Sequence, residues 1–128
     1  MPISEIQLLS IPVSNQTRAL DFYVNQLGME LVADTAIEQD RRWVQVRPRG
    51  GSTSIALVTW FPTMPAGSSR GTVLEADDIE KEVALLRSRG VPIGGEIEEA
   101  PWGRFVSFDD PDGNGLVLQQ TASAARAR

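Results

Sequence analysis

The sequence predicts an α+β fold built from two βαβββ modules in tandem. Two observations lead to this prediction. The first is that the chain contains the same series of features twice: a strand-like alternation, a helical pattern and a terminating glycine. The second is that the two copies are offset by about 62 residues. These features are found at 6–13, 14–27 and Gly28 in the first copy, and at 71–76, 77–89 and Gly90 in the second. Further strand-like stretches at 42–46 and 104–108 repeat in the same way, so each copy is one supersecondary unit.

The first module begins with a strand over 6–13, in which apolar residues alternate with others. A helix is expected to start between Ser14 and Thr17. It should end at Gly28, because glycine readily adopts the left-handed conformation that terminates helices. Strands are then predicted near 30–37, 42–47 and 53–59, with a hairpin turn at 47–51.

The second module follows a linker at 61–69 that is rich in proline, glycine and serine. Its first strand is predicted at 71–76, and its helix runs from the N-capping residues Asp77 and Asp78 to Gly90. Strands are predicted near 91–98, 103–108 and 115–120, with a turn at Pro111-Asp112-Gly113-Asn114.

The length of the chain, 128 residues, suits a single compact domain. We place this domain at 1–120, with one module at about 1–60 and the other at about 70–120. The remaining residues, 121–128, are mostly alanine, serine and arginine, and are expected to form a flexible tail.

Charge and missing residue types exclude several classes of function. The net charge is −5 and no basic stripe is present, so we expect no nucleic-acid partner. No apolar run reaches the ~20 residues of a membrane span, and the N-terminus does not resemble a signal peptide. We therefore expect a cytoplasmic protein with no membrane partner. The chain has no cysteine and no histidine, which excludes disulfides, thiolate or imidazole metal ligands, and Ser-His or Cys-His nucleophile pairs.

Two segments resemble a known superfamily. Residues 11–31 (IPVSNQTRALDFYVNQLGMEL) are similar to the opening of a glyoxalase-type module. Residues 101–114 (PWGRFVSFDDPDGN) resemble the closing segment of bleomycin-resistance-like proteins. Together with the repeat, the resemblance covers nearly the whole chain except the tail. The chain thus resembles the glyoxalase, bleomycin resistance and extradiol dioxygenase superfamily, which has the vicinal oxygen chelate fold.

The resemblance implies that each module's sheet forms half of a curved barrel and that the two modules surround a cleft. Metal-dependent members place four ligands, mostly His and Glu, on the first and last strands of the modules. The corresponding positions here are Leu8, Ala56, Gly71 and Val117, and none of them binds a metal through its side chain. We therefore expect no metal, no other cofactor, and no metal-dependent glyoxalase or dioxygenase activity. The resemblance also implies a homodimer.

If Leu8 faces the cleft, alternation along each strand assigns the other inward positions. The residues predicted to line the cleft are Ser10, Trp43, Gln45, Ser54, Val58, Trp60, Glu75, Phe105, Ser107 and Gln119, with Trp102 at the rim. The residues expected to face the helices as core include Leu9, Ile11, Val13, Val44, Val46, Val106 and Phe108. Aromatic walls with a few polar groups are typical of a small-molecule pocket.

Several of these residues have a second interpretation. Trp43 and Phe105 fit a core position equally well, because aromatic residues dominate buried area in any domain. Trp60, together with Phe61 and Met64, also fits a subunit interface. The acidic turn near Asp112 lacks the spacing of a calcium loop and is interpreted as a simple turn.

The sequence therefore predicts a protein that binds a small organic molecule, aromatic or cationic, in an aromatic-lined cleft without converting it. The alternative is a metal-independent lyase or isomerase that uses Glu75, the one inward carboxylate, as general base. A third hypothesis is an interaction module whose cleft is filled by its own side chains. The sequence leaves open whether the protein is an enzyme.

Overall fold

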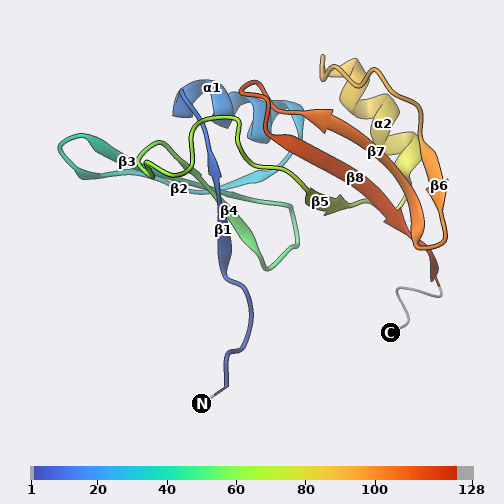
Figure 1. Ribbon diagram of the computed structural model, residues 1–128, viewed down its shortest axis with the longest axis horizontal. Helices are drawn as coiled ribbons and strands as arrows, with labels where there is room; N and C mark the ends of the chain where they lie inside the picture. The colour runs from blue at the N-terminus through green and yellow to red at the C-terminus, as the bar shows by residue number, and fades with distance from the viewer. Residues whose placement is uncertain (1, 124–128) are drawn as a thin grey trace. The chain divides into compact units, whose positions relative to one another are not determined.

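The computed structural model describes residues 2–123, which divide into two compact units. Unit 1 comprises the residues up to Ser69 together with the turn Pro111–Asn114. Unit 2 comprises Arg70–Asp110 and the residues from Gly115 onward. Each unit contains one four-stranded mixed sheet and one helical element (Figure 1). The predicted α+β fold with two βαβββ modules is confirmed.

The sheet of unit 1 has the strand order β1-β4-β3-β2. Its strands are β1 (Leu8–Pro12), β2 (Glu30–Glu38), β3 (Arg41–Arg47) and β4 (Ser54–Val58). β1 runs parallel to β4, while the other neighbouring pairs are antiparallel. The parallel pair forms because the helical segment between β1 and β2 carries the chain across the sheet.

The helix of unit 1 changes character along its length. α1 (Gln16–Leu20) begins after Asn15, whose side chain accepts a hydrogen bond of 2.9 Å from the backbone nitrogen of Arg18. The helix continues as the π-helical segment η1 (Asp21–Gln26), in which the Leu27 N–H donates to the carbonyl of Phe22, five residues earlier. Periodicity predicts an uninterrupted α-helix here, because the π-turn leaves no separate mark in the apolar pattern.

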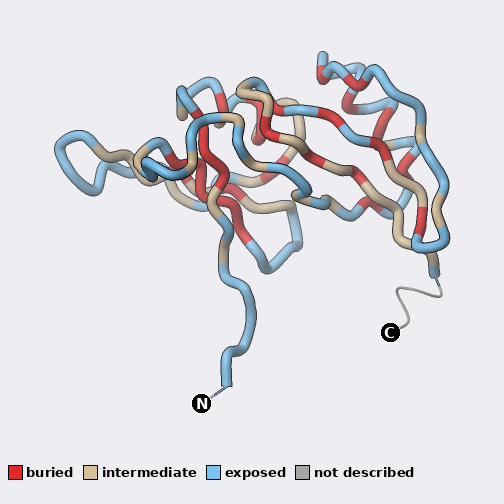
Figure 2. The backbone as a smooth tube through the Cα atoms, in the orientation of Figure 1, coloured by how far each residue is buried: buried red, intermediate tan, exposed pale blue. Residues whose placement is uncertain are grey.

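The core of unit 1 lies between this helical segment and the sheet. Phe22 and Tyr23 are at most 3% exposed, and their rings form a T-shaped, edge-to-face pair with 5.2 Å between centroids. On the sheet, Val44, Val46 and Leu57 are fully buried, as predicted for the two valines. Figure 2 shows such buried residues spaced along the strands and helices.

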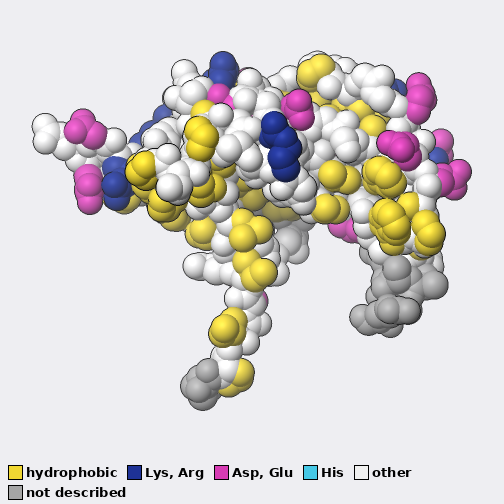
Figure 3. Space-filling model, in the orientation of Figure 1, with side chains coloured by type: hydrophobic (Ala, Val, Ile, Leu, Met, Phe, Trp, Pro, Cys, Tyr) yellow, Lys and Arg dark blue, Asp and Glu magenta, His cyan; other side chains and the backbone are white. Residues whose placement is uncertain are grey.

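Leu9 does not belong to this core, although alternation predicts that it does. It is 53% exposed, whereas Ile11 and Val13 on the same strand face are buried. Leu9 lies near the start of β1, which is an edge strand of the sheet and has a neighbouring strand on one side only. The residues preceding β1 are exposed as well, including Ile3 and Ile6, and Figure 3 shows apolar side chains along this N-terminal stretch.

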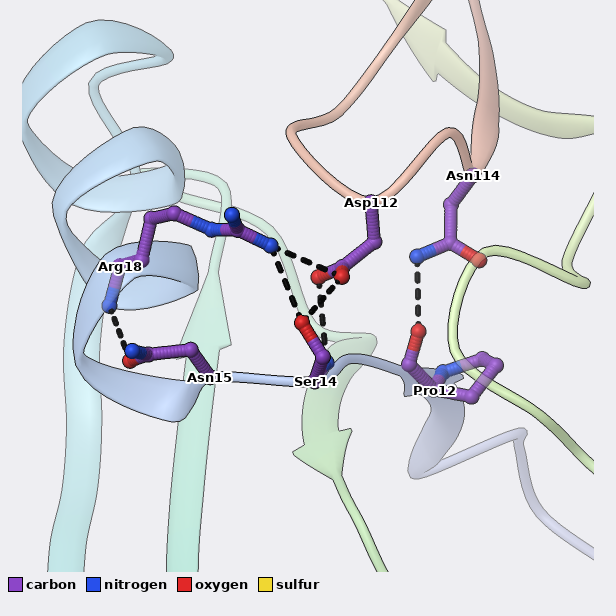
Figure 4. Close-up of polar contacts among 6 residues, drawn as sticks. All are labelled: Pro12, Ser14, Asn15, Arg18, Asp112 and Asn114. Atoms are coloured by element: carbon purple, nitrogen blue, oxygen red, sulfur yellow. Dashed lines mark hydrogen bonds and ion pairs between the residues drawn. The ribbon is translucent and has the colours of Figure 1, made fainter.

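The turn Pro111–Asn114 is anchored in unit 1 by two side chains (Figure 4). Asn114 is fully buried; its Nδ2 donates to the carbonyl of Pro12 at 2.8 Å, and its Oδ1 accepts from the backbone nitrogen of Ser69 at 3.0 Å. Asp112 accepts hydrogen bonds from the backbone nitrogen and hydroxyl of Ser14, and it pairs with Arg18 at 2.9 Å. The Asp112 carboxylate thus has protein partners on both oxygens, which agrees with the interpretation of this segment as a turn.

Unit 2 has the strand order β5-β8-β7-β6. Its strands are β5 (Thr72–Glu75), β6 (Glu98–Ala100), β7 (Gly103–Asp109) and β8 (Gly115–Thr121). α2 (Ile79–Ser88) is capped by Asp78, whose side chain accepts from the backbone nitrogen of Lys81 at 3.2 Å. α2 buries one face, made of Ile79, Val83 and Leu86.

The prediction of a strand at 91–98 is wrong, because β6 covers only Glu98–Ala100 and the residues before it are irregular. Val91 and Ile93 are buried, which produces the strand-like alternation, but Gly94 and Gly95 interrupt it. The carbonyls of Ile93 and Gly95 accept hydrogen bonds from Arg87 instead of a strand neighbour.

The first residues of the tail predicted at 121–128 are part of the fold. Thr121 belongs to β8, and the backbone nitrogen of Ala122 donates to the carbonyl of Trp102 at 2.8 Å. The remainder of the predicted tail, residues 124–128, lies outside the described residues.

Candidate functional site

The sheet of unit 1 has one face toward α1 and one face away from it, and the register shows which residues share the second face. Gln45 lies opposite Ala56 on β4 and opposite Ala33 on β2, and Ala56 in turn lies opposite Ser10 on β1. Because side chains alternate along a strand, Trp43 lies on the same face as Gln45. Arg42, which alternates with Trp43 and Gln45 on β3, hydrogen bonds to Thr17 of α1, so Trp43 and Gln45 lie on the face away from α1.

An aromatic cluster forms on this face. We use this name for Trp43, Trp60 and Phe61. The ring centroids of Trp43 and Trp60 are 6.1 Å apart, and those of Trp60 and Phe61 are also 6.1 Å apart. Trp43 and Trp60 are partly exposed and Phe61 is 43% exposed. The cluster is therefore a ring surface that a planar molecule can reach within unit 1.

Two polar side chains contact rings of the aromatic cluster. The guanidinium carbon of Arg41 lies 5.1 Å from the centroid of the Trp60 ring, in a cation–π arrangement. The Trp43 indole N–H donates to the Oε1 of Gln45 at 2.9 Å. Sequence reasoning missed Arg41, although it precedes Trp43 by two residues on the same strand and alternation assigns it to the same face.

The other predicted site residues of unit 1 are less accessible. Ser54 is 3% exposed and Val58 is 1% exposed, so their side chains offer little surface to a ligand. Ser10 is partly exposed on the edge strand β1. The accessible part of the predicted set in this unit therefore centres on the aromatic cluster and Gln45.

Unit 2 carries a smaller aromatic pair. Trp102 and Phe105 stack with 6.4 Å between centroids and an interplanar angle of 17°. Trp102 is 54% exposed. The register places Phe105 opposite Glu98 on β6 and opposite Gln119 on β8, and Gln119 lies opposite Glu75. Ser107 is exposed on the same strand, β7.

Glu75, the candidate general base, is an exposed residue at the end of β5. Its Oε1 accepts from the Thr121 hydroxyl at 2.6 Å, and its Oε2 accepts from the Thr121 backbone nitrogen at 3.1 Å. Gln119 also donates to the Thr121 hydroxyl, at 3.0 Å. Because both carboxylate oxygens already accept hydrogen bonds from the end of β8, the contacts favour a structural role for Glu75.

A polar hollow of about 340 Å³ lies at the β2–β3 hairpin. It is lined by Gln16, Asp34–Ala36 and Glu38–Arg42. Three of its side chains are engaged: Gln16 donates to two backbone carbonyls, and Arg42 pairs with Asp34 through two hydrogen bonds of 2.8 Å. The hollow contains none of the aromatic rings. We therefore place the candidate site at the aromatic cluster, where exposed rings and unused donors occur together.

The Asp34–Arg42 pair makes stability depend on pH. The two hydrogen bonds from the Arg42 guanidinium hold the pKa of the Asp34 carboxyl below its usual value. The pair therefore contributes its full stability above the unfolded-state pKa of about 3.9, and the contribution is lost as pH falls through the lower folded-state pKa.

Asp34→Asn is expected to lower the free energy of unfolding by up to about 1 kcal/mol at neutral pH, because the pair is partly exposed. The difference from the wild type should shrink as pH falls below about 3.9, because the carboxylate is then progressively protonated. Urea unfolding at neutral and at acidic pH measures this, with Asp40→Asn as a control at a neighbouring carboxylate. If the free energy of unfolding of Asp34→Asn stays below that of the wild type by the same amount at low pH, the ion-pair explanation is contradicted.

Comparison with known proteins identifies the family. A family model described as the Glyoxalase/Bleomycin resistance protein/Dioxygenase superfamily matches residues 5–118. The chain belongs to this superfamily. The YetH protein of Bacillus subtilis (strain 168) is 31% identical over 121 residues, which cover 92% of this chain and 99% of YetH.

Solved structures of superfamily members are also similar. TnmS3, an antibiotic binding protein from Streptomyces sp. CB03234, is 49% identical with a TM-score of 0.89, and the match covers 95% of this chain and 99% of TnmS3. A glyoxalase/bleomycin resistance protein from the same strain is 48% identical with a TM-score of 0.81, covering 91% of this chain and 100% of that protein.

The metal that many members of the superfamily hold does not fit this chain. The positions to which the sequence resemblance assigns the family's metal ligands are Leu8, Ala56, Gly71 and Val117, and their side chains are apolar or absent. Between residues 2 and 123, no group of three or more Asp or Glu side chains lies close enough together to hold a metal ion. No helix in that part of the chain is long and apolar enough to cross a membrane.

Proposed function

We propose that this superfamily member binds a small organic molecule with a planar aromatic portion at the aromatic cluster of unit 1. The observation that carries the proposal is the contiguous ring surface of Trp43, Trp60 and Phe61 on the sheet face away from α1. Stacking on such rings is worth about 1–3 kcal/mol per planar group in other aromatic binding surfaces.

The local hydrogen bonding supports stacking as the mode of binding. The Trp43 indole N–H is already satisfied by Gln45, so the ring does not need a water or a ligand atom at its edge. The Trp60 ring is held between Trp43, Phe61 and Arg41. Rings fixed in this way lose little conformational entropy when a ligand stacks on them, which favours affinity.

The similarity to TnmS3 supports a ligand of the antibiotic type. TnmS3 is an antibiotic binding protein, and it is 49% identical to this chain over 95% of its length. We propose sequestration and not turnover, because the chain has no histidine or cysteine and the Glu75 carboxylate is engaged by Thr121. The molecule would be bound without a metal, in the cytoplasm, by a homodimer.

The proposal is tested by titrating the protein with a panel of planar aromatic antibiotics while recording tryptophan fluorescence. Saturable quenching is expected for at least one compound, and chromatography should recover that compound unchanged. Mass determination in solution, with and without the compound, tests whether Trp60 and Phe61 instead form a subunit contact. Binding at the aromatic cluster is contradicted if no compound quenches the tryptophan fluorescence. It is also contradicted if quenching is lost when the subunits associate.

A further inference from the structure

We propose that the ligand of the aromatic cluster carries an anionic or hydrogen-bond-accepting oxygen on its aromatic portion, and that Arg41 and Gln45 recognise it. This inference rests on the proposed function and names its ligand class. It differs from the cationic ligand that the acidic net charge of −5 favours.

The arrangement of the side chains around the aromatic cluster favours this ligand class. Arg41 lies over Trp60, Trp60 is adjacent to Trp43, and Trp43 is hydrogen bonded to Gln45. The four side chains therefore form a continuous series in which two rings are flanked by two polar groups. Arg41 and Gln45 are four residues apart on β3, so their Cα atoms are separated by about 13 Å. A fused-ring molecule lying on the cluster would have its edges near one or both polar groups.

The polar groups at both ends of this series are hydrogen-bond donors. Gln45 uses its Oε1 to accept from Trp43, which leaves its amide NH₂ as the remaining group. Within residues 2–123, neither this NH₂ nor the Arg41 guanidinium has a hydrogen-bond partner. Donors of this kind match carbonyl, phenolate or carboxylate oxygens and do not match a cation.

Arg41 differs from the other two arginines of β3. Arg42 is paired with Asp34, and Arg47 is paired with Glu30 at 3.0 Å. Arg41 has Glu38 as its cross-strand neighbour, yet its guanidinium lies over Trp60. Arg41 is therefore the arginine of this strand whose charge is directed toward the aromatic cluster.

The net negative charge of the chain does not cancel this local preference. Charges on the surface are screened beyond about 8 Å at physiological ionic strength. Glu38 and Asp40 lie near Arg41 at the hairpin, but in residues 2–123 neither forms an ion pair with it. A ligand in direct contact with Arg41 and Gln45 is therefore governed by these donors more than by carboxylates elsewhere on the chain.

The test uses two probes of similar shape and opposite charge, anthracene-2-carboxylate and the 9-aminoacridinium cation, measured by calorimetric titration at neutral pH. The wild type is expected to bind the carboxylate about tenfold more tightly than the cation. Arg41→Gln should lower affinity for the carboxylate about tenfold, and Arg41→Lys should lower it less. Arg49→Gln, which removes the same charge from the exposed hairpin turn, is the matched control and should change neither affinity.

A second variant separates the hydrogen bond from the charge. Gln45→Glu keeps an acceptor for the Trp43 indole N–H but replaces the free NH₂ with a carboxylate oxygen. This variant should lower the affinity for the anionic probe about tenfold and raise the affinity for the cationic probe. The inference is overturned if both probes bind and the cation binds as tightly as the carboxylate. It is also overturned if Arg41→Gln and Gln45→Glu leave the preference for the carboxylate unchanged. Failure of both probes to bind contradicts the proposed function itself.

Discussion

Trp60→Ala is expected to lower affinity for the aromatic ligand by tenfold to a hundredfold, or about 1.4–2.7 kcal/mol. Trp60 contacts both other rings of the aromatic cluster and also supports the Arg41 guanidinium. Its removal takes away a stacking surface and the group that positions the flanking cation. Calorimetric titration of the tightest compound from the fluorescence panel measures the loss.

Controls for this experiment are available in the same chain. Trp60→Phe keeps a ring and should recover much of the affinity. Leu85→Ala removes an exposed apolar side chain on α2 and should have no effect. Trp102→Ala tests the aromatic pair of unit 2. A large loss with Trp102→Ala and none with Trp60→Ala would place the site in unit 2 and contradict our assignment.

Asn114→Ala is expected to have the largest effect on stability, lowering the free energy of unfolding by about 2–3 kcal/mol. The Asn114 side chain is fully buried and satisfies the Pro12 carbonyl and the Ser69 N–H. Alanine would leave both backbone groups without this partner in an environment that water reaches poorly. Urea unfolding followed by circular dichroism measures the change.

The control is Asn25→Ala, because Asn25 makes an exposed side-chain hydrogen bond with Asp21. That variant should change stability by no more than about 0.5 kcal/mol. If Asn114→Ala is as mild as Asn25→Ala, the Asn114 contacts do not anchor the turn.

The sequence was sufficient to predict the elements whose pattern is local. The helix boundaries at Gly28 and Gly90 follow from the conformation that glycine adopts. The side to which each β3 side chain points follows from period-two alternation. The irregular segment before β6 was mistaken for a strand because buried Val91 and Ile93 alternate with exposed residues. Alternation alone does not distinguish a strand from an irregular segment with the same burial pattern.

Contacts between distant residues could not be predicted. Asn114 bonds to Pro12 across 102 positions, and nothing local to either residue indicates that partner. Gly67 has a positive φ of 84°, and a Cβ there would overlap the carbonyl oxygen of Asp112. The linker glycine is thus required by a turn far away in sequence. The Arg41–Trp60 contact likewise depends on how the residues after β4 return over β3.

A crystal structure of the protein with the tightest compound of the panel would show whether the aromatic cluster of unit 1 binds the ligand. We expect the planar part of the compound to stack on Trp43 and Trp60, with an oxygen within hydrogen-bond distance of Arg41 or the Gln45 amide nitrogen. A fully occupied ligand bound elsewhere on the chain, with these rings left in contact with solvent, would contradict this expectation.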